Sequence, residues 1–61
     1  MTEKEARRLQ VGDGVAWVGI GKQTICGTVT ARSPFGFYAE WDDGDSGWID
    51  YRDAIQVQYH D

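Results

Sequence analysis

The sequence predicts an all-β fold, in which five short antiparallel strands form a bent sheet closed into a small barrel behind a short amino-terminal helix. From residue 11 onward, short apolar runs alternate with Gly, Asp, Ser and Pro, the pattern of strands and turns. Asp43-Gly44 lies between two aromatic-flanked segments and predicts a tight hairpin turn, because such a turn needs a residue that tolerates positive φ. With 61 residues, the chain is expected to hold one domain. Residues 1–10 would form the helix or arm, and residues 11–61 the barrel.

The amino-terminal segment has the features of one or two helical turns. Thr2 and Glu5 have the spacing of a capping box, and Ala6 and Leu9 could face the barrel. The alternative is a basic docking arm built on Lys4, Arg7 and Arg8. The helix is the favoured interpretation, because terminal segments are usually solvated.

The five expected strands are 15–18, 24–31, 37–42, 47–51 and 55–59. They are joined by a flexible loop at 19–22, a proline-containing turn at 33–36, the acidic hairpin turn and a single helical turn at 52–54. Gly27 inside the second strand indicates a bulge, a bend or a close backbone approach.

The core is expected to consist of apolar residues that share the inward face of the strands. Its members would be Val11, Val15, Val29, Ala39, Trp41, Ile49, Ile55 and Val57.

The distribution of charged residues indicates which kind of partner the protein could bind. The net charge is -4, and six acidic residues fall within 40–53, where Arg52 is the only base. Phosphate binding depends on Lys and Arg, and the chain has no basic stripe. Nucleic acid is therefore disfavoured as a direct ligand, with the short basic arm as the only counter-indication, and a cationic partner is favoured.

Cys26 is the only cysteine, which excludes an intramolecular disulfide and a thiolate zinc site and favours a reducing cytoplasm. No apolar run reaches membrane-spanning length, and residues 1–4 begin no signal peptide. We expect a soluble cytoplasmic protein with no membrane partner.

The sequence lacks an arrangement of residues that would indicate a catalytic site. His60, the only histidine, lies beside the carboxyl terminus, and we expect Cys26 to have no adjacent base. Residues 42–53 are loosely similar to a calcium loop, but Gly44 at its third position offers no side-chain ligand and no glutamate stands at the twelfth. We assign no catalytic residue, no metal ligand and no cofactor.

Several motifs together resemble the SH3-like small barrels of the Tudor and chromo-like group, over roughly residues 9–59. They are Val11-Gly12-Asp13-x-Val15-x-Trp17, Gly27-x-Val29, Ala39-x-Trp41-Asp42-Asp43-Gly44, Trp48-Ile49 and Asp53-x-Ile55-x-Val57. The resemblance implies an SH3-like barrel and, as in Tudor-type domains, a cage of aromatic rings around a methylated lysine or arginine, closed by an acidic residue. The implied rings are Trp17, Phe37 or Tyr38, and Trp41 or Trp48, with Asp42, Asp43 or Asp45 as the carboxylate. The alternative is that these rings simply fill the core.

A second, weaker resemblance is to the type II plasmid-borne dihydrofolate reductases, which are SH3-like barrels active as tetramers. Residues 36–40 and 48–51 stand where that family has its third strand and its active-site strand. Ile49 replaces the required glutamine and Asp50 the required isoleucine, while Tyr51 matches. Because Ile49 cannot form the amide hydrogen bonds, we expect no reductase activity.

The leading functional hypothesis is a small non-enzymatic interaction module that binds a basic protein or peptide through an acidic aromatic rim. The rim residues would be Trp17, Tyr38, Trp48, Tyr51, Asp42, Asp43 and Asp45. If Ile49 is inward, Trp48 is exposed and Tyr51 falls on the core side; otherwise Trp48 packs under the helix. By association, a phage or other mobile element is the expected source. The alternatives are a homo-oligomeric small-molecule-binding protein or enzyme with a site shared between subunits, and a nucleic-acid-associated accessory protein.

Overall fold

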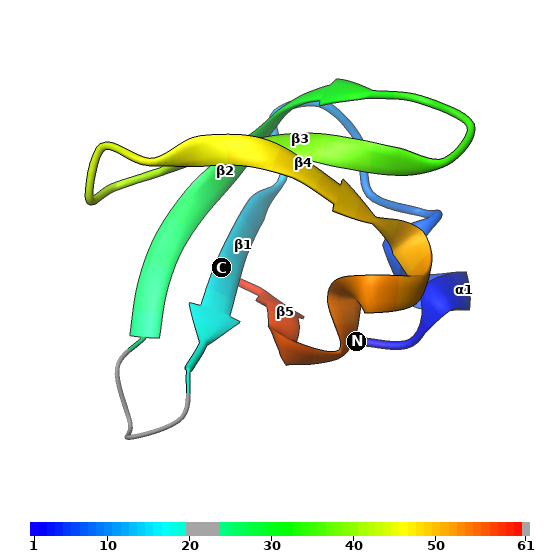
Figure 1. Cartoon of the computed structure of the whole chain (residues 1–61), viewed down its shortest axis with the longest axis horizontal. Coiled ribbons are helices and arrows are strands. Elements are labelled where there is room, and N and C mark those ends of the chain that lie inside the picture. Colours follow the sequence, from blue (N-terminus) through cyan, green and yellow to red (C-terminus); the bar gives the residue numbers. More distant parts are fainter. Residues whose placement is uncertain (20–23, 61) are drawn as a thin grey trace.

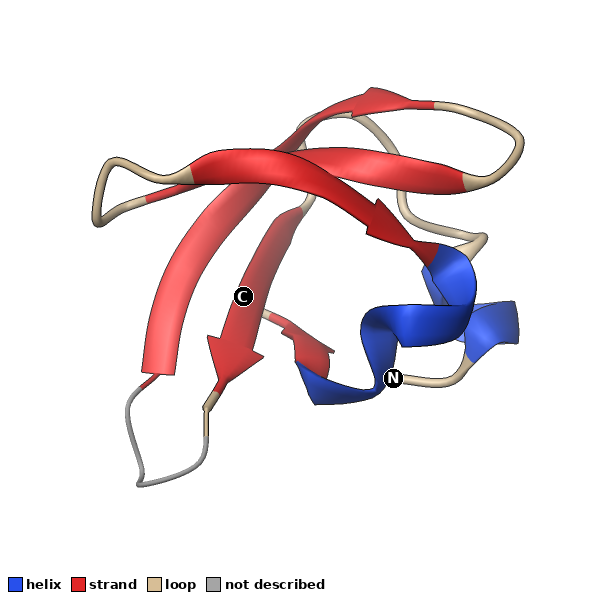
Figure 2. Ribbon diagram, viewed as in Figure 1, coloured by secondary structure: helices blue, strands red, loops and turns tan. Residues whose placement is uncertain are grey.

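The computed structural model describes residues 1–19 and 24–60 and contains one five-stranded antiparallel sheet (Figures 1 and 2). Its elements are α1 (Glu3–Ala6), β1 (Gly14–Val18), β2 (Thr24–Arg32), β3 (Gly36–Trp41), β4 (Ser46–Asp50), the 3-10 helix η1 (Tyr51–Gln56) and β5 (Val57–Tyr59). The predicted all-β class and the short amino-terminal helix are confirmed. The predicted loop at 19–22 lies, apart from Gly19, outside the described residues.

The sheet has the strand order β4-β3-β2-β1-β5, and each neighbouring pair is antiparallel. It is strongly bent, so that β4 and β3 cross over the space enclosed by β1, β5 and η1 (Figure 1). Within the described ranges β4 and β5 are the two edges and do not pair with each other. The expected closure into a barrel is therefore not made, because the chain leaves β4 into η1 and reaches β5 only after that helix.

The bend is accompanied by two local features of β2. The pairing register with β3 shifts between Val29 and Ala31, as at a bulge, which increases local twist. Gly27 pairs with Trp41, and a Cβ at Gly27 would lie 2.6 Å from Cε3 of that indole. Of the bulge, bend or close backbone approach expected at Gly27, the structure shows the close approach, since a Cβ there would also lie 2.7 Å from the carbonyl oxygen of Glu40.

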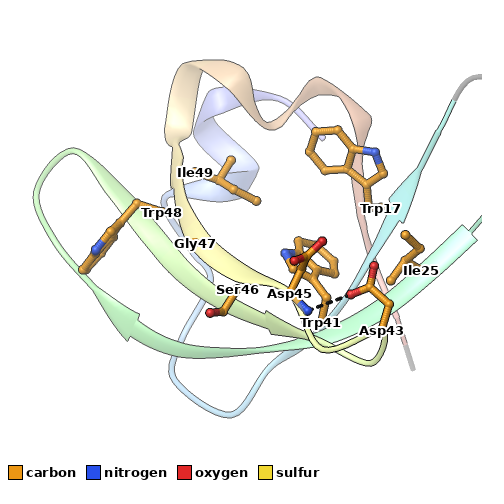
Figure 3. Close-up of a pocket in the computed structure, with 9 residues that line it drawn as sticks. All are labelled: Trp17, Ile25, Trp41, Asp43, Asp45, Ser46, Gly47, Trp48 and Ile49. Atoms are coloured by element: carbon orange, nitrogen blue, oxygen red, sulfur yellow. Dashed lines mark hydrogen bonds between the residues drawn. The ribbon is translucent and has the colours of Figure 1, made fainter.

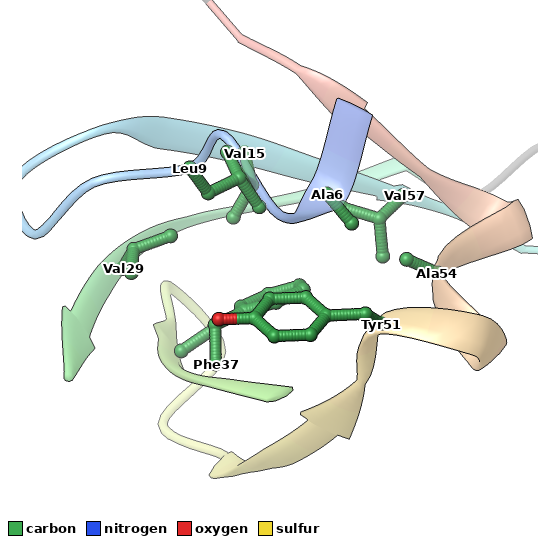
Figure 4. Packing of buried hydrophobic residues seen from close by; sticks show 9 residues of the cluster. Ala6, Leu9, Val15, Val29, Phe37, Tyr51, Ala54 and Val57 are labelled. Atoms are coloured by element: carbon green, nitrogen blue, oxygen red, sulfur yellow. The ribbon is translucent and has the colours of Figure 1, made fainter. Parts of the chain in front are cut away.

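The core lies between the concave face of the sheet and the two helices (Figure 4). Phe37 and Tyr51 pack against each other at its centre, with ring centroids 6.3 Å apart and planes tilted by 34°. The buried cluster consists of Ala6, Leu9, Val15, Val29, Phe37, Ala39, Tyr51, Ala54 and Val57.

The predicted core is partly correct. Val15, Val29, Ala39 and Val57 are fully buried, while Trp41 and Ile49 are half-buried and pack against the cluster.

Val11 and Ile55 were wrongly assigned to the core, since they are 64% and 82% exposed. Val11 lies in the turn before β1, where Gly12 has a φ of 99°. Ile55 lies in η1 and not in a strand. The helical spacing turns Tyr51 and Ala54 inward and leaves Ile55 in solvent.

The amino-terminal segment packs onto the domain as the helix interpretation expects. Thr2 Oγ1 accepts the Glu5 N–H at 3.2 Å, and a Glu5 carboxylate oxygen accepts the Thr2 N–H at 2.9 Å, which completes the capping box. Ala6 and Leu9 are buried. The Arg7 guanidinium forms an ion pair with Glu3 and stands 5.0 Å above the centre of the Tyr51 ring. No helix in the described ranges has the length and apolar character needed to cross a bilayer.

Candidate functional site

The acidic hairpin between β3 and β4 has a tightly defined backbone. Gly44 N–H donates to the carbonyl of Trp41 at 3.0 Å, and Trp41 N–H donates to the carbonyl of Asp45 at 2.8 Å. Gly44 has a φ of 95°, which confirms that the turn needs a glycine there. The Asp43 carboxylate accepts the Asp45 N–H at 3.0 Å, so the turn holds the Asp43 side chain at the end of the sheet.

A pocket of about 340 Å³ opens beside this hairpin, on the concave side of the sheet (Figure 3). Its residues come from β1, β2, β3, β4 and the hairpin itself. They are Trp17, Ile25, Trp41, Asp43, Asp45, Ser46, Gly47, Trp48 and Ile49, and we call this site the Trp17–Trp41 pocket.

Two indoles form the aromatic part of the pocket. The rings of Trp17 and Trp41 meet edge to face, with centroids 6.2 Å apart and planes at 80°. Trp17 reaches this position from β1, opposite Ile25, and Trp41 from β3, opposite Gly27. Because Gly27 has no side chain, the Trp41 indole can approach β2 closely at this position. Both rings also pack against the core, which restricts their motion.

The polar part of the pocket is acidic. Asp43 and Asp45 are exposed, and they line the same pocket as Trp17 and Trp41 (Figure 3). The ion pairs found among the described residues are Arg7–Glu3 and Arg52–Asp50, so neither pocket carboxylate takes part in one. An aromatic surface beside two carboxylates is suited to a cation and offers no general base in a desolvated position.

Asp50, at the far end of β4, differs from Asp43 and Asp45 because it forms an ion pair with Arg52. Hydrogen bonds from the side chain and the backbone N–H of Arg52 hold the pKa of the Asp50 carboxyl below its ordinary value. The same contact raises the pKa of the Arg52 guanidinium. Asp50 therefore already has a cationic partner within the chain.

The structure divides the sequence-predicted rim between two surfaces and the core. Trp17, Asp43 and Asp45 lie in the pocket, whereas the exposed Asp42 is not among its lining residues. The predicted rim residues therefore do not form one continuous surface.

Tyr38 and Trp48 lie together on the opposite face of the sheet. Their ring centroids are 5.4 Å apart, with planes at 76°, and the Tyr38 hydroxyl donates to Ser46 Oγ at 2.8 Å. Trp48 is 58% exposed, as expected from an inward Ile49. It borders the pocket from β4, but its indole points away from Trp17 and Trp41 (Figure 3).

Tyr51 does not belong to any rim, because its side chain is 2% exposed and lies in the core. Its hydroxyl donates to the carbonyl of Ser33 at 2.8 Å, which satisfies the one polar atom of the ring. The physical reason is that Tyr51 begins η1 and faces Phe37 across the core.

Trp41, Ile25 and Ile49 are pocket residues that the rim hypothesis left out. Trp41 and Ile49 were assigned to the core because they share the inward face with other apolar residues. That assignment was right about direction. The inward face, however, continues past the core to the end of the sheet, and side chains there are only half-buried.

A contact between Cys26 and His60, outside the pocket, corrects the expectation that Cys26 has no adjacent base. Cys26 Sγ lies 3.6 Å from His60 Nε2, although the two residues are 34 positions apart. His60 reaches it because its N–H donates to the carbonyl of Gly14 at 3.0 Å, which extends the β1–β5 pairing. Cys26 thus has a basic neighbour that is distant in sequence. The pair has no third ligand, since no cluster of three His, Cys, Asp or Glu side chains that could hold a metal occurs in the described part of the chain.

The fold and the site together define a small all-β domain with an aromatic, acidic pocket at one end of an open sheet. Comparisons of the chain with protein-family models, with curated proteins and with solved structures find no match. The functional argument therefore rests on the geometry of this site.

Proposed function

We propose that the protein is a non-enzymatic interaction module and that its Trp17–Trp41 pocket binds a basic side chain of a protein or peptide partner. The observation that carries the proposal is the edge-to-face Trp17–Trp41 pair with two carboxylates in the same pocket. An ammonium or guanidinium over an indole face gains about 0.5–2 kcal/mol, more as it is desolvated. The carboxylates of Asp43 and Asp45 add attraction of the same sign.

The charge of the whole chain supports a cationic partner. A net charge of -4 raises the local concentration of cations and speeds their encounter with the site, while it opposes the approach of phosphates. Alkylation of the bound ammonium would weaken its hydration and leave its charge in place, so lysine and alkylated lysine are both candidates for the pocket.

The finer classification is part of the same proposal. We propose that the domain is SH3-like, on the five antiparallel strands and the 3-10 helix before the last of them, with its sheet left open between β4 and β5. We further propose a phage or mobile-element source and action in the cytoplasm, on the association with short acidic single-domain proteins and on the single cysteine.

Fluorescence titration tests the proposal, because binding at the pocket changes the surroundings of two tryptophans. The probe is a synthetic peptide of alternating lysine and threonine, and the matched peptide carries norleucine in place of lysine. We expect the lysine peptide to bind and the norleucine peptide to bind at least about tenfold more weakly.

Paired variants separate the pocket from general charge. The double variant Asp43→Asn, Asp45→Asn should weaken binding of the lysine peptide about tenfold or more. The control Asp42→Asn, Asp53→Asn removes the same charge outside the pocket and should have a much smaller effect. Equal losses in the two double variants, or equal affinity for the two peptides, would refute the proposal.

A further inference from the structure

The outer edge of β4 carries unpaired backbone groups. Two hydrogen bonds bracket the β3–β4 ladder, Trp41 N–H to Asp45 O and Tyr51 N–H to Phe35 O. Antiparallel pairs alternate between bonded and non-bonded residues. By this alternation, Gly47 and Ile49 are the β4 residues whose backbone groups bond to β3. The N–H and C=O groups of Ser46, Trp48 and Asp50 then point away from β3.

The other edge of the sheet is less accessible. β5 has three residues, and the amino group of Met1 donates to the carbonyl oxygens of Val57 and of Ala54. The Tyr59 hydroxyl in turn reaches the carbonyl of Glu5 at 3.5 Å. The amino-terminal segment therefore protects this edge, whereas no strand in the described ranges lies beside the outer edge of β4.

The sequence of β4 is complementary to itself when two copies run antiparallel about Trp48. In that register, Trp48 faces Trp48 of the second copy, Ser46 faces Asp50, and Gly47 faces Ile49. No carboxylate of β4 faces another carboxylate. The residues with free backbone groups also fall opposite one another, as a bonded pairing needs.

The side chains fit the same register. Ser46 Oγ accepts the Tyr38 hydroxyl, so the Ser46 proton is free to be donated to the Asp50 carboxylate of the second copy. A Cβ at Gly47 would meet nothing within 4 Å, so there is room beside it for Ile49 of the second copy. The Trp48 indole, exposed in one copy, would be covered by its counterpart.

We propose that two copies of the chain pair through β4 about a two-fold axis at Trp48, forming one sheet that is continuous through both. This is an isologous contact, in which the same surface serves both partners. Both Trp17–Trp41 pockets then lie on concave faces that flank the axis, because Gly47 and Ile49 line the pocket and pair across the interface. A partner with two basic side chains could occupy both pockets at once and gain avidity.

Sedimentation equilibrium over a range of concentrations tests the pairing, with Trp48→Lys as the disrupting variant. Lysine on an edge strand opposes pairing, and here two lysines would face each other on the axis. Ile55→Lys is the matched control, because Ile55 is also apolar and exposed but lies in η1. We expect wild type and Ile55→Lys to dimerise, and Trp48→Lys to weaken dimerisation at least about tenfold.

A second measurement follows the backbone. Amide exchange at Ser46, Trp48 and Asp50 should slow as the protein concentration rises, while amides of the β5 edge should not change. Ser46→Pro removes an outward N–H and should weaken the dimer, whereas Ser46→Ala keeps that N–H and should weaken it less.

Three results would overturn the proposal. The first is a monomer at millimolar concentration, and the second is equal dimerisation of wild type and Trp48→Lys. The third is protection of the β4 amides only when the lysine–threonine peptide is added, with no change in mass, which would make the edge a site for an extended peptide.

Discussion

At the scale of single residues, two strand glycines have opposite roles. A side chain at Gly27 would collide with Trp41, at 2.6 Å from Cε3, and with the carbonyl oxygen of Glu40, at 2.7 Å. A side chain at Gly47 would meet nothing within 4 Å. Gly27 is therefore required by the packing of the pocket indole, whereas among the described residues no contact requires a glycine at position 47.

Gly27→Ala is expected to destabilise the protein by about 1–3 kcal/mol, because Trp41 and the β3 backbone must move to accept the methyl group. Chemical denaturation followed by tryptophan fluorescence would measure the loss. Gly47→Ala, the matched control at low protein concentration, should change the free energy of unfolding by less than about 1 kcal/mol. Similar losses at the two positions would contradict the close approach seen at Gly27.

At the scale of elements, α1 is too short to be stable alone. It has four residues, and an isolated helix of this length does not form in water. Its stability comes from the capping box between Thr2 and Glu5 and from burial of Ala6 and Leu9 against the sheet. The element exists because local hydrogen bonds and tertiary burial act on the same few residues.

The capping box predicts a pH-dependent contribution to stability. Hydrogen bonds from the backbone N–H and the side chain of Thr2 lower the pKa of the Glu5 carboxyl in the folded protein. A group with a lowered folded-state pKa stabilises the protein above its unfolded-state pKa, and this stabilisation is lost as the pH falls through the folded-state value. Glu5→Gln should therefore be less stable than wild type at pH 7, and the difference should shrink below about pH 4.

The measurement is urea denaturation across this pH range, with an NMR titration of the Glu5 carboxyl. Glu40→Gln is the control, because Glu40 is an exposed glutamate near the end of β3 and does not cap a helix. A Glu5 midpoint at or above the ordinary glutamate value would contradict the prediction.

At the scale of the whole molecule, one small core connects every layer. Phe37 from β3 and Tyr51 from η1 meet at its centre, and residues of α1, β1, β2 and β5 surround them (Figure 4). A domain of this size buries a smaller fraction of its surface on folding than a larger domain does, and it has a small margin of stability. Loss of one large core side chain should therefore affect all elements together.

Phe37→Ala is expected to cost about 3–5 kcal/mol, enough to unfold much of the protein at room temperature. Phe35→Ala is the matched control two residues away, on an exposed side chain, and should stay within about 0.5 kcal/mol of wild type. Circular dichroism during thermal unfolding would measure both. A loss of stability well below this range for Phe37→Ala would mean that the elements do not depend on one common core.

Features that depend on neighbours in the chain could be predicted from the sequence. The Thr2–Glu5 capping box and the positive φ at Gly44 arise from residues within one turn of each other, so their spacing was sufficient. Alternation likewise placed Ile49 and Trp48 on opposite faces, and of the two orientations left open the structure shows Ile49 inward and Trp48 outward. Ile55 shows the limit, because the same apolar residue suits a strand or the outer face of a helix, and its surroundings determine which forms.

By itself, the sequence determined the all-β class, the acidic hairpin and the face on which most strand residues lie, because these follow from local backbone preferences and period-two alternation. Only the tertiary structure decided which faces meet. Strand order brings Trp17 against Trp41, pairs Tyr38 with Trp48 on the other side, and leaves the edge of β4 open. Alternation gives the direction of a side chain but not the identity of the strand beside it. That identity depends on contacts between distant residues, through the register shift in β2 and the packing of η1.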